Sequence, residues 1–360
     1  MSLLEFVDPP MLTADLPGIG GSIRGQLEDF QVEEIPSYEP SGEGEHLFLW
    51  IEKKNVSAEW LLKMVAKRLD MSKRDIGCAG LKDRHAITRQ YLSVPTKLED
   101  RIDRINSDDI KVLHSKRHGN KIKTGHQKGN KFIVRIRGVS REQAPAVDAI
   151  LARIAVTGLP NYYGEQRFGH NLETLDTGLK LLRKEPVRVT PFLRKLSLSA
   201  VQSLLFNAVL GRRLRDGLLS TVLPGDVMQK VSGGLFVAEN FPEEQERFDR
   251  RETIHAGPIF GRKTFAAKAD AAERELRVLA ESGLTPASFE GFGNLVEGTR
   301  RANLVHLGDL RTEWDDAGLI LKFSLPSGSY ATVLLREVMK NAGSVEPMAV
   351  LEESLETAED

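Results

Sequence analysis

The stretch GCAGLKDRHAITRQYLSV, residues 77–94, surrounds one carboxylate with cations. Asp83 lies between Lys82 and Arg84, after a run of four small residues that permits a tight turn. RQYLSV, residues 89–94, predicts a strand, so we expect a connection into that strand with Asp83 near its end. Two interpretations are open at this point. Asp83 is either a solvated acid in a surface loop or a carboxylate held ionised so that it can react.

The residues before this stretch predict a strand and then a helix. HLFLWIEKK, residues 46–54, is typical of a strand that becomes polar at its end. SAEWLLKMVAKRLD, residues 57–70, predicts a helix with Ser57 as its N-cap, because its apolar residues fall on one stripe. The stretch around Asp83 is therefore expected to join this helix to the strand at residues 89–94.

The predicted secondary structure becomes mainly helical in the middle third of the chain. Residues 172–182, 199–214 and 268–282 predict helices, and the block from 156 to 305 is mainly helical. Strand-like stretches precede and follow the block. We therefore expect one discontinuous domain, residues 1–155 plus 306–345, interrupted by an inserted domain at 156–305. An acidic tail at residues 346–360 is expected to be disordered.

Composition restricts the class of protein. A chain of 360 residues is long enough for a large core and two domains. Neither a signal peptide nor an apolar stretch that could span a bilayer is found, which predicts a cytoplasmic protein without membrane association. Cys78 is the only cysteine, so no internal disulfide and no cysteine-based metal cluster are expected, and Cys78 itself is assigned to packing.

The segment from residue 110 to residue 141 contains no Asp or Glu. It holds ten Lys and Arg residues and three histidines, a pattern that favours a phosphate backbone as partner. Within it KFIVRIRG, residues 131–138, alternates with a period of two and predicts a strand with one packed and one basic face. Its glycines predict a basic hairpin with a flexible tip, residues 111–137.

Several common chemistries are excluded by their missing motifs. The chain has no nucleotide-binding P-loop and no G-x-S-x-G nucleophile motif, and its histidines are not spaced as metal ligands. Asp83 therefore remains as the candidate reactive group, and neighbouring cations are expected to lower its pKa. An ionised aspartate can attack a sugar carbon or act as a general base.

Six ordered elements resemble the TruD family of tRNA pseudouridine synthases. The stretch around Asp83 resembles the family signature, and the other five resemble its further conserved elements along most of the chain. These are LEDFQVEEI (residues 27–35), GNKFIV (129–134), PNYYGEQRFG (160–169), LSAVQSLLFNAVLGRRL (198–214) and FSLPSGSYATVLLRE (323–337).

The resemblance implies a fold and a reaction. The fold would be the α+β pseudouridine-synthase fold, a mixed, largely antiparallel sheet with helices, carrying a mainly helical inserted domain. The reaction would isomerise a uridine of tRNA, at position 13 in this family, to pseudouridine. The N-glycosidic bond breaks, the uracil turns while bound, and C5 rejoins C1′. No cofactor and no metal would be needed.

The resemblance also assigns roles to residues of this chain. Asp83 would be the catalytic carboxylate, acting by addition to C1′, by addition to the base, or by removing a ribose proton. The residues expected to bind the target nucleotide are Arg24, Phe30, Asn130, Phe132 and Phe323. For Phe132 and Phe323, a role in the core is an equally open interpretation. The residues expected to contact the RNA backbone are Lys82, Arg84, Lys121, Lys123, Lys128, Lys131 and Arg167. A solvated face is expected for Arg212, Arg213 and Arg215.

Other functions stay open beside the isomerase. An RNA-binding protein or tRNA chaperone would bind tRNA without chemistry, and an Asp-dependent N-glycosidase would release free uracil. A methyltransferase is disfavoured because a cofactor loop is missing. The expected partner is tRNA, with no obligate protein partner, and a monomer is preferred.

Overall fold

The computed structural model describes residues 3–169 and 172–341, so the predicted acidic tail lies outside the described residues. The chain forms two compact units. We call them the sheet unit, which contains residues 18–147, 307–331 and 339–341, and the helical unit, which contains the other described residues.

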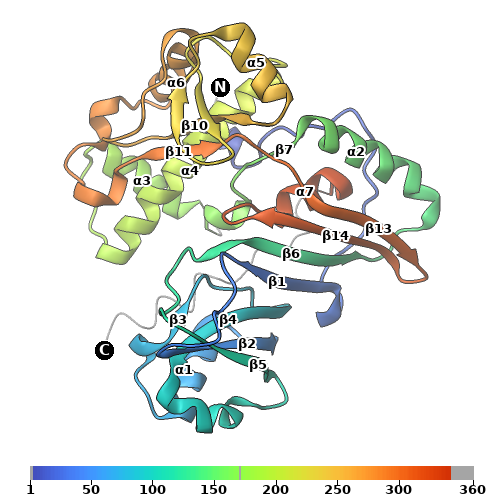
Figure 1. Ribbon diagram of the computed structural model, residues 1–360. Helices are drawn as coiled ribbons and strands as arrows, with labels where there is room; N and C mark the ends of the chain where they lie inside the picture. The colour runs from blue at the N-terminus through green and yellow to red at the C-terminus, as the bar shows by residue number, and fades with distance from the viewer. Residues whose placement is uncertain (1–2, 170–171, 342–360) are drawn as a thin grey trace. The chain divides into compact units, whose positions relative to one another are not determined.

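The sheet unit is built on one mixed sheet of eight strands (Figure 1). Its strand order is β13-β14-β6-β1-β4-β2-β5, and β3 pairs with β4 beside this path. β1 and β4 run parallel, and the other neighbouring pairs are antiparallel. The strands are β1 (Phe30–Pro36), β2 (His46–Lys54), β3 (Gly77–Cys78), β4 (Ile87–Pro95), β5 (Ile110–His118), β6 (Gln127–Ile136), β13 (Gly308–Asp315) and β14 (Gly318–Pro326).

One helix covers part of this sheet. α1 (Ala58–Leu69) begins after Ser57, whose Oγ accepts a hydrogen bond from the Trp60 main-chain N–H at 3.1 Å, as predicted for an N-cap. Leu61, Val65 and the other buried residues of its apolar stripe pack against Leu47, Leu49 and Ile51 of β2. The alternation of β2 therefore directs one face of the strand into this core.

The predicted basic hairpin is wrong. β5 pairs only with β2 and lies at the sheet edge, whereas β6 pairs with β1 and β14. Residues 119–126 therefore form a crossover connection rather than a hairpin tip. Ile122 is 4% exposed and its main-chain N–H donates to Ser93 Oγ at 2.9 Å, so the connection is anchored where flexibility was expected.

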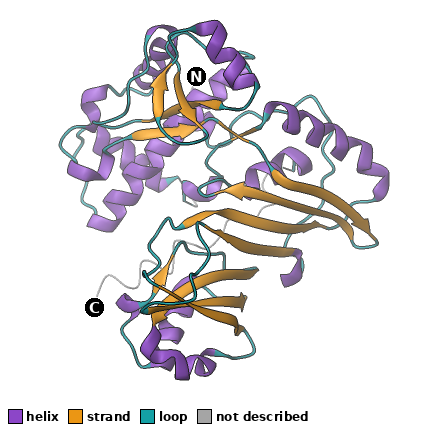
Figure 2. Cartoon of the chain, viewed as in Figure 1, coloured by secondary structure: helices purple, strands orange, loops and turns teal. Residues whose placement is uncertain are grey.

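The helical unit surrounds a long central helix, α4 (Figure 2). α4 begins at Pro191, earlier than predicted, because Thr190 caps its N-terminus. Its buried side chains form the main core of this unit. The helices assigned wholly or mostly to the unit are α2 (Ala144–Thr157), α3 (Glu173–Leu182), α4 (Pro191–Arg215), α5 (Phe241–Asp249), α6 (Ala269–Glu281) and α7 (Ala331–Met339).

Small sheets complete the helical unit. A four-stranded sheet has the order β11-β10-β8-β9, and a two-stranded ladder joins β12 to β7. The bounds are β7 (Leu159–Pro160), β8 (Val227–Lys230), β9 (Leu235–Val237), β10 (Thr253–Ile259), β11 (Thr299–Ala302) and β12 (Leu304–Val305).

The N-terminal segment belongs to the helical unit through a buried glutamate. Glu337 of α7 is 1% exposed, and its carboxylate accepts hydrogen bonds from the main-chain N–H groups of Leu12 and Thr13 and from the Thr13 hydroxyl. These contacts group residues 3–17 with α7. The predicted division into a catalytic and an inserted domain stays a prediction, since compactness alone does not define an insertion.

The mixed, largely antiparallel sheet with helices confirms the predicted fold class. No helix among residues 3–169 and 172–341 is both long and apolar enough to cross a membrane.

Candidate active site around Asp83

The loop that carries Asp83, residues 79–86, joins β3 to β4 and is fixed by main-chain contacts. The carbonyl oxygen of Ala79 accepts a hydrogen bond from Gly125 N–H at 2.8 Å, and that of Gly80 accepts one from Gln90 Nε2 at 3.3 Å. The carbonyl oxygen of Asp83 itself accepts one from Lys53 Nζ at 2.5 Å. These three hydrogen bonds therefore fix the backbone that carries the carboxylate.

Lys53 is a site residue that the sequence analysis missed. Its side chain is fully buried on β2, and its ammonium also donates to the carbonyl of Val56 at 2.7 Å. Burial lowers the pKa of Lys53 to about 8, although the Asp83 carboxylate opposes that effect. The alternation of inward and outward side chains along β2 could have identified Lys53 as buried. Lys53 occupies the next inward position after the buried Leu49 and Ile51.

The Asp83 carboxylate faces Arg24 in a partly buried position. Arg24 Nη2 lies 3.9 Å from Asp83 Oδ2, and the two side chains are 15% and 24% exposed. Burial raises the pKa of Asp83 above its ordinary value, while Arg24, Lys53 and Lys82 act against this rise. The cations do lower this pKa, as expected, but desolvation of the carboxylate outweighs their attraction and the net pKa is raised. The Asp83 side chain is half-buried beside Arg24 rather than fully solvated.

Three aromatic rings extend from Arg24 along the sheet. The guanidinium carbon of Arg24 lies 4.5 Å from the ring centroid of Phe30. Phe30 meets Phe132 edge to face at 6.3 Å, and Phe132 stacks on Phe323 at 5.2 Å. The structure thus brings these predicted residues together. All three rings are at most 7% exposed, so they also belong to the core of the sheet unit.

Strand register places Lys53 and this aromatic wall on the same face. Cross-strand partners share a face of the sheet. The register gives one row across five strands, and its members are Lys53, Thr88, Val32, Phe132 and Phe323.

Asn130 lies two residues before Phe132 on β6, so it shares that face. The glycine before it is required by close packing, since a Cβ atom on Gly129 would lie 2.2 Å from the carbonyl oxygen of Leu325. The Oδ1 atom of Asn130 is buried without a hydrogen-bond partner, as are Gln90 Oε1 and Thr88 Oγ1. Such atoms are costly unless a ligand or water satisfies them. The site therefore has acceptors available for a polar ligand.

Lys82 is not a backbone contact, contrary to prediction. Its side chain is 4% exposed and its ammonium lies 3.0 Å from Glu34 Oε2, where it also donates to Gln127 Oε1 at 2.6 Å. Burial raises the pKa of Glu34, and Lys82 opposes this. The charge of the buried Lys82 is therefore matched by Glu34 inside the sheet unit.

Comparison with known proteins decides the family. The family model for tRNA pseudouridine synthase D (TruD) matches residues 7–189 and 187–338. The chain belongs to the TruD family. A tRNA pseudouridine synthase D of Anaeromyxobacter sp. (strain Fw109-5) is 42% identical over 96% of this chain and 99% of its own length. One from Thermus thermophilus is 44% identical over 92% of both chains.

A solved structure supports the fold of this TruD-family chain. A crystal structure of a Methanosarcina mazei protein assigned as tRNA pseudouridine synthase D (TruD) superposes with a TM-score of 0.78 at 23% identity. It covers 94% of this chain and 97% of its own. Among the residues that the structure describes, no group of three or more His, Cys, Asp or Glu side chains could hold a metal ion.

The other residues of this TruD-family chain that were predicted to contact the RNA backbone differ in exposure. Arg84, Lys123, Lys128 and Lys131 are exposed on the sheet unit, and Lys121 is half-buried there, donating to the carbonyl of Arg74 at 2.5 Å. Arg167 lies in the helical unit, where its guanidinium donates to the hydroxyls of Ser199 and Ser203.

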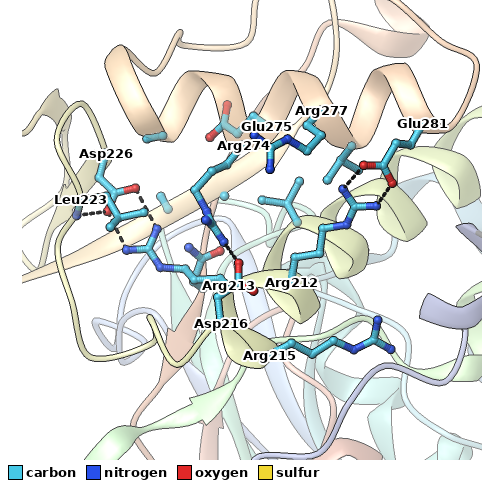
Figure 3. A pocket seen from close by; sticks show the side chains of 16 residues that line it. Arg212, Arg213, Arg215, Asp216, Leu223, Asp226, Arg274, Glu275, Arg277 and Glu281 are labelled. Carbon is cyan, nitrogen blue, oxygen red and sulfur yellow. Dashed lines mark hydrogen bonds and ion pairs between the residues drawn. The ribbon is translucent and has the colours of Figure 1, made fainter. Parts of the chain in front are cut away.

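A second cation-rich region of the chain is a pocket of about 430 Å³ in the helical unit, between α4 and α6 (Figure 3). Arg213 is buried and paired with Asp226 at 2.6 Å, so its predicted solvated position is wrong. Arg212 pairs with Glu281 and Arg274 with Asp216. Carboxylates thus balance these arginines, and we assign the pocket to the internal structure of this unit.

Proposed function

We propose that this tRNA pseudouridine synthase, an isomerase, converts uridine 13 of tRNA to pseudouridine with Asp83 as its catalytic carboxylate. The observation that carries the assignment is the Asp83 loop. Its main chain is held by Lys53, while the carboxylate meets Arg24 at 3.9 Å, beyond hydrogen-bond distance. The oxygen atoms of Asp83 therefore keep their capacity to engage a substrate.

The pKa of Asp83 suits this task. Burial makes the carboxylate more basic than an ordinary surface aspartate, and Arg24 and Lys53 stabilise its ionised form. Addition to C1′, addition to the base and abstraction of a ribose proton all need an ionised and basic carboxylate. The bond that breaks joins C1′ to N1 and the bond that forms joins C1′ to C5. C5 loses its proton and N1 gains one, so atoms and electrons balance between uridine and its isomer.

The uracil must leave its stack to reach Asp83. We propose that the edge of the Phe132 ring contacts the extracted base and that Asn130 Oδ1 accepts a hydrogen bond from its N3–H. The buried, unpartnered state of Asn130 Oδ1 supports this role. Stacking or edge contact with a ring offsets part of the unstacking cost, at about 1–3 kcal/mol per base.

The RNA backbone would lie along the exposed basic residues of the sheet unit. Arg84 follows Asp83 directly, and Lys128 and Lys131 flank Asn130 in the sequence. These exposed charges are suited to phosphates, which fix the register of an RNA without reading its bases. Lys121 and Lys123, which are also candidates for contact with the RNA backbone, belong to the crossover connection.

The experiment uses an unmodified tRNA transcript, the purified full chain and no added cofactor. Nucleoside analysis after digestion should find pseudouridine at position 13, and a transcript with cytidine at that position should yield none. Free uracil in place of pseudouridine would support an N-glycosidase. Tight binding without product would support a tRNA chaperone, and either result would overturn the proposal.

A further inference from the structure

The crossover connection forms a second concave site on the sheet unit. The site has a volume of about 460 Å³, and we call it the crossover pocket. Its lining residues are Tyr38, His118, Asn120, Lys121, Lys123 and His126. This set contains cations, hydrogen-bond donors and aromatic rings but no carboxylate, in contrast to the balanced arginine pocket of Figure 3.

The pocket wall is an ordered aromatic group. Tyr38 stacks on His118 with ring centroids 5.0 Å apart, and Phe48 contacts the same histidine at 4.8 Å. The Tyr38 hydroxyl lies 2.7 Å from His126 Nδ1. The connection itself is held to the sheet unit by Ile122, which packs in a buried cluster with Phe48. The two histidines are therefore fixed in position.

Main-chain contacts determine which nitrogen of each histidine carries the proton. The Ser41 N–H donates to His118 Nδ1 at 3.2 Å, and the Lys123 N–H donates to His126 Nδ1 at 3.4 Å. A main-chain N–H can only donate, so Nδ1 is the acceptor in each neutral ring. Nε2 then carries the hydrogen. Both rings consequently contribute an Nε2–H donor.

Positive charge surrounds these donors. Lys123 is exposed, and the ammonium of Lys121 donates to the neutral carbonyl of Arg74, which leaves its charge uncompensated by that contact. Asn120 adds an exposed amide. Several N–H donors together with two ammonium groups match the oxygen atoms of a phosphate.

We propose that the crossover pocket binds one backbone phosphate of the substrate RNA, outside the catalytic site. The proposal rests on the proposed function for the identity of the RNA. The hydrogen bond from Gly125 to Ala79 ties the connection to the loop that carries Asp83. A phosphate held here therefore fixes the RNA relative to that loop and contributes to affinity, while the chemical step is left to Asp83.

The test compares Lys123→Gln and His118→Phe with the unaltered chain. The phenylalanine preserves the ring contact with Tyr38 and removes both ring nitrogens, and Lys123 is exposed, so its change does not disturb packing. Lys63→Gln is the matched control, since Lys63 is an exposed lysine on α1 of the same unit. Filter binding of the tRNA transcript at several salt concentrations gives the dissociation constant and its salt dependence, and single-turnover assays at saturating protein give the rate.

The two pocket variants should bind tRNA about 3–10-fold more weakly, with a salt slope reduced by roughly 0.7 for Lys123→Gln, while the saturated rate is unchanged. Equal affinities in the pocket variants and the unaltered chain, or an equal loss in Lys63→Gln, would overturn the proposal. Titration with inorganic phosphate, followed by NMR of the histidine rings, separates the two phosphate sources. Shifts at His118 and His126 with unchanged tRNA affinity would mean that the pocket takes free phosphate. The filter assay measures tRNA binding and the single-turnover assay measures product. Failure of the isomerase assignment would therefore appear as missing product, whatever the affinities of the pocket variants.

Discussion

Asp29 and Asp83 both face an arginine within the sheet unit, but their surroundings differ. Asp29 is 1% exposed, and its oxygen atoms accept hydrogen bonds at 2.7 Å from Arg137 Nε, Arg137 Nη2 and the Gln26 main-chain N–H. Burial raises its pKa, but these hydrogen bonds outweigh burial, and the net pKa is lowered. Asp83 meets Arg24 at 3.9 Å, and its net pKa is raised.

The difference separates a structural carboxylate from a reactive one. The Asp29 carboxylate accepts hydrogen bonds from groups inside the protein, so its ionised form stabilises the fold. The loop of Asp83 is held through its carbonyl oxygen instead, which leaves the carboxylate for chemistry. An aspartate beside an arginine is therefore informative only when the distance and the hydrogen bonds are known.

The largest expected effect concerns stability. Asp29→Asn should lower the free energy of unfolding by about 1.5–3 kcal/mol, because the buried carboxylate loses its charge-assisted hydrogen bonds from Arg137. Since the pKa of Asp29 is lowered in the folded state, the difference from the unaltered chain should shrink as the pH falls below about 4. Urea unfolding at several pH values measures both the loss of stability and its dependence on pH.

Asp315→Asn is the matched control for that experiment. Asp315 pairs with Arg135, but its side chain is 45% exposed, so the loss should be clearly smaller than in Asp29→Asn. Equal losses in the two variants would remove the distinction between a buried and an exposed pair.

A smaller effect is expected when the support of the Asp83 loop is removed. Lys53→Met keeps the length of the side chain but loses the hydrogen bond to the Asp83 carbonyl, so kcat should fall by about 10–100-fold through misplacement of the carboxylate. Single-turnover assays give the rate, and filter binding should give an unchanged tRNA affinity. Lys54→Met, next in sequence with an exposed side chain, should retain the rate. A normal rate in Lys53→Met would show that the carbonyl contact has no role in positioning.

The smallest expected effect is a shift in pH dependence. Arg24 lowers the pKa of Asp83, so Arg24→Gln should raise it further. Activity needs the ionised carboxylate, so the acid limb of the pH–rate profile should move to higher pH while the rate on the alkaline side of that limb changes less. An acid limb that moves to lower pH would contradict the assignment of this limb to Asp83.

Local sequence patterns predicted much of the fold. The apolar run of residues 46–54, which becomes polar at its end, predicted β2 with its bounds, and Ser57 proved to be the N-cap of α1. Strand pairing was beyond such patterns, because it depends on contacts between distant segments. The segment from 111 to 137 was therefore taken as a hairpin, although β5 and β6 lie apart in the sheet.

The candidate site was predictable in part. The family signature singled out Asp83. The structure places Arg24 beside it and connects Arg24 through Phe30 and Phe132 to Phe323. The sequence did not reveal the sign of the pKa change, since burial is a property of the tertiary structure. It also did not distinguish Lys82, which is neutralised by Glu34, from the exposed lysines.

The most direct test of the central claim measures activity and stability in one variant, Asp83→Asn. The rate of pseudouridine formation should fall by at least about 1,000-fold, because no ionised carboxylate remains at the reacting sugar. The free energy of unfolding should remain within about 0.5 kcal/mol of the unaltered chain, since the raised pKa means that the ionised carboxylate does not stabilise the fold. An active Asp83→Asn protein, or an inactive one that has lost as much stability as Asp29→Asn, would contradict the account.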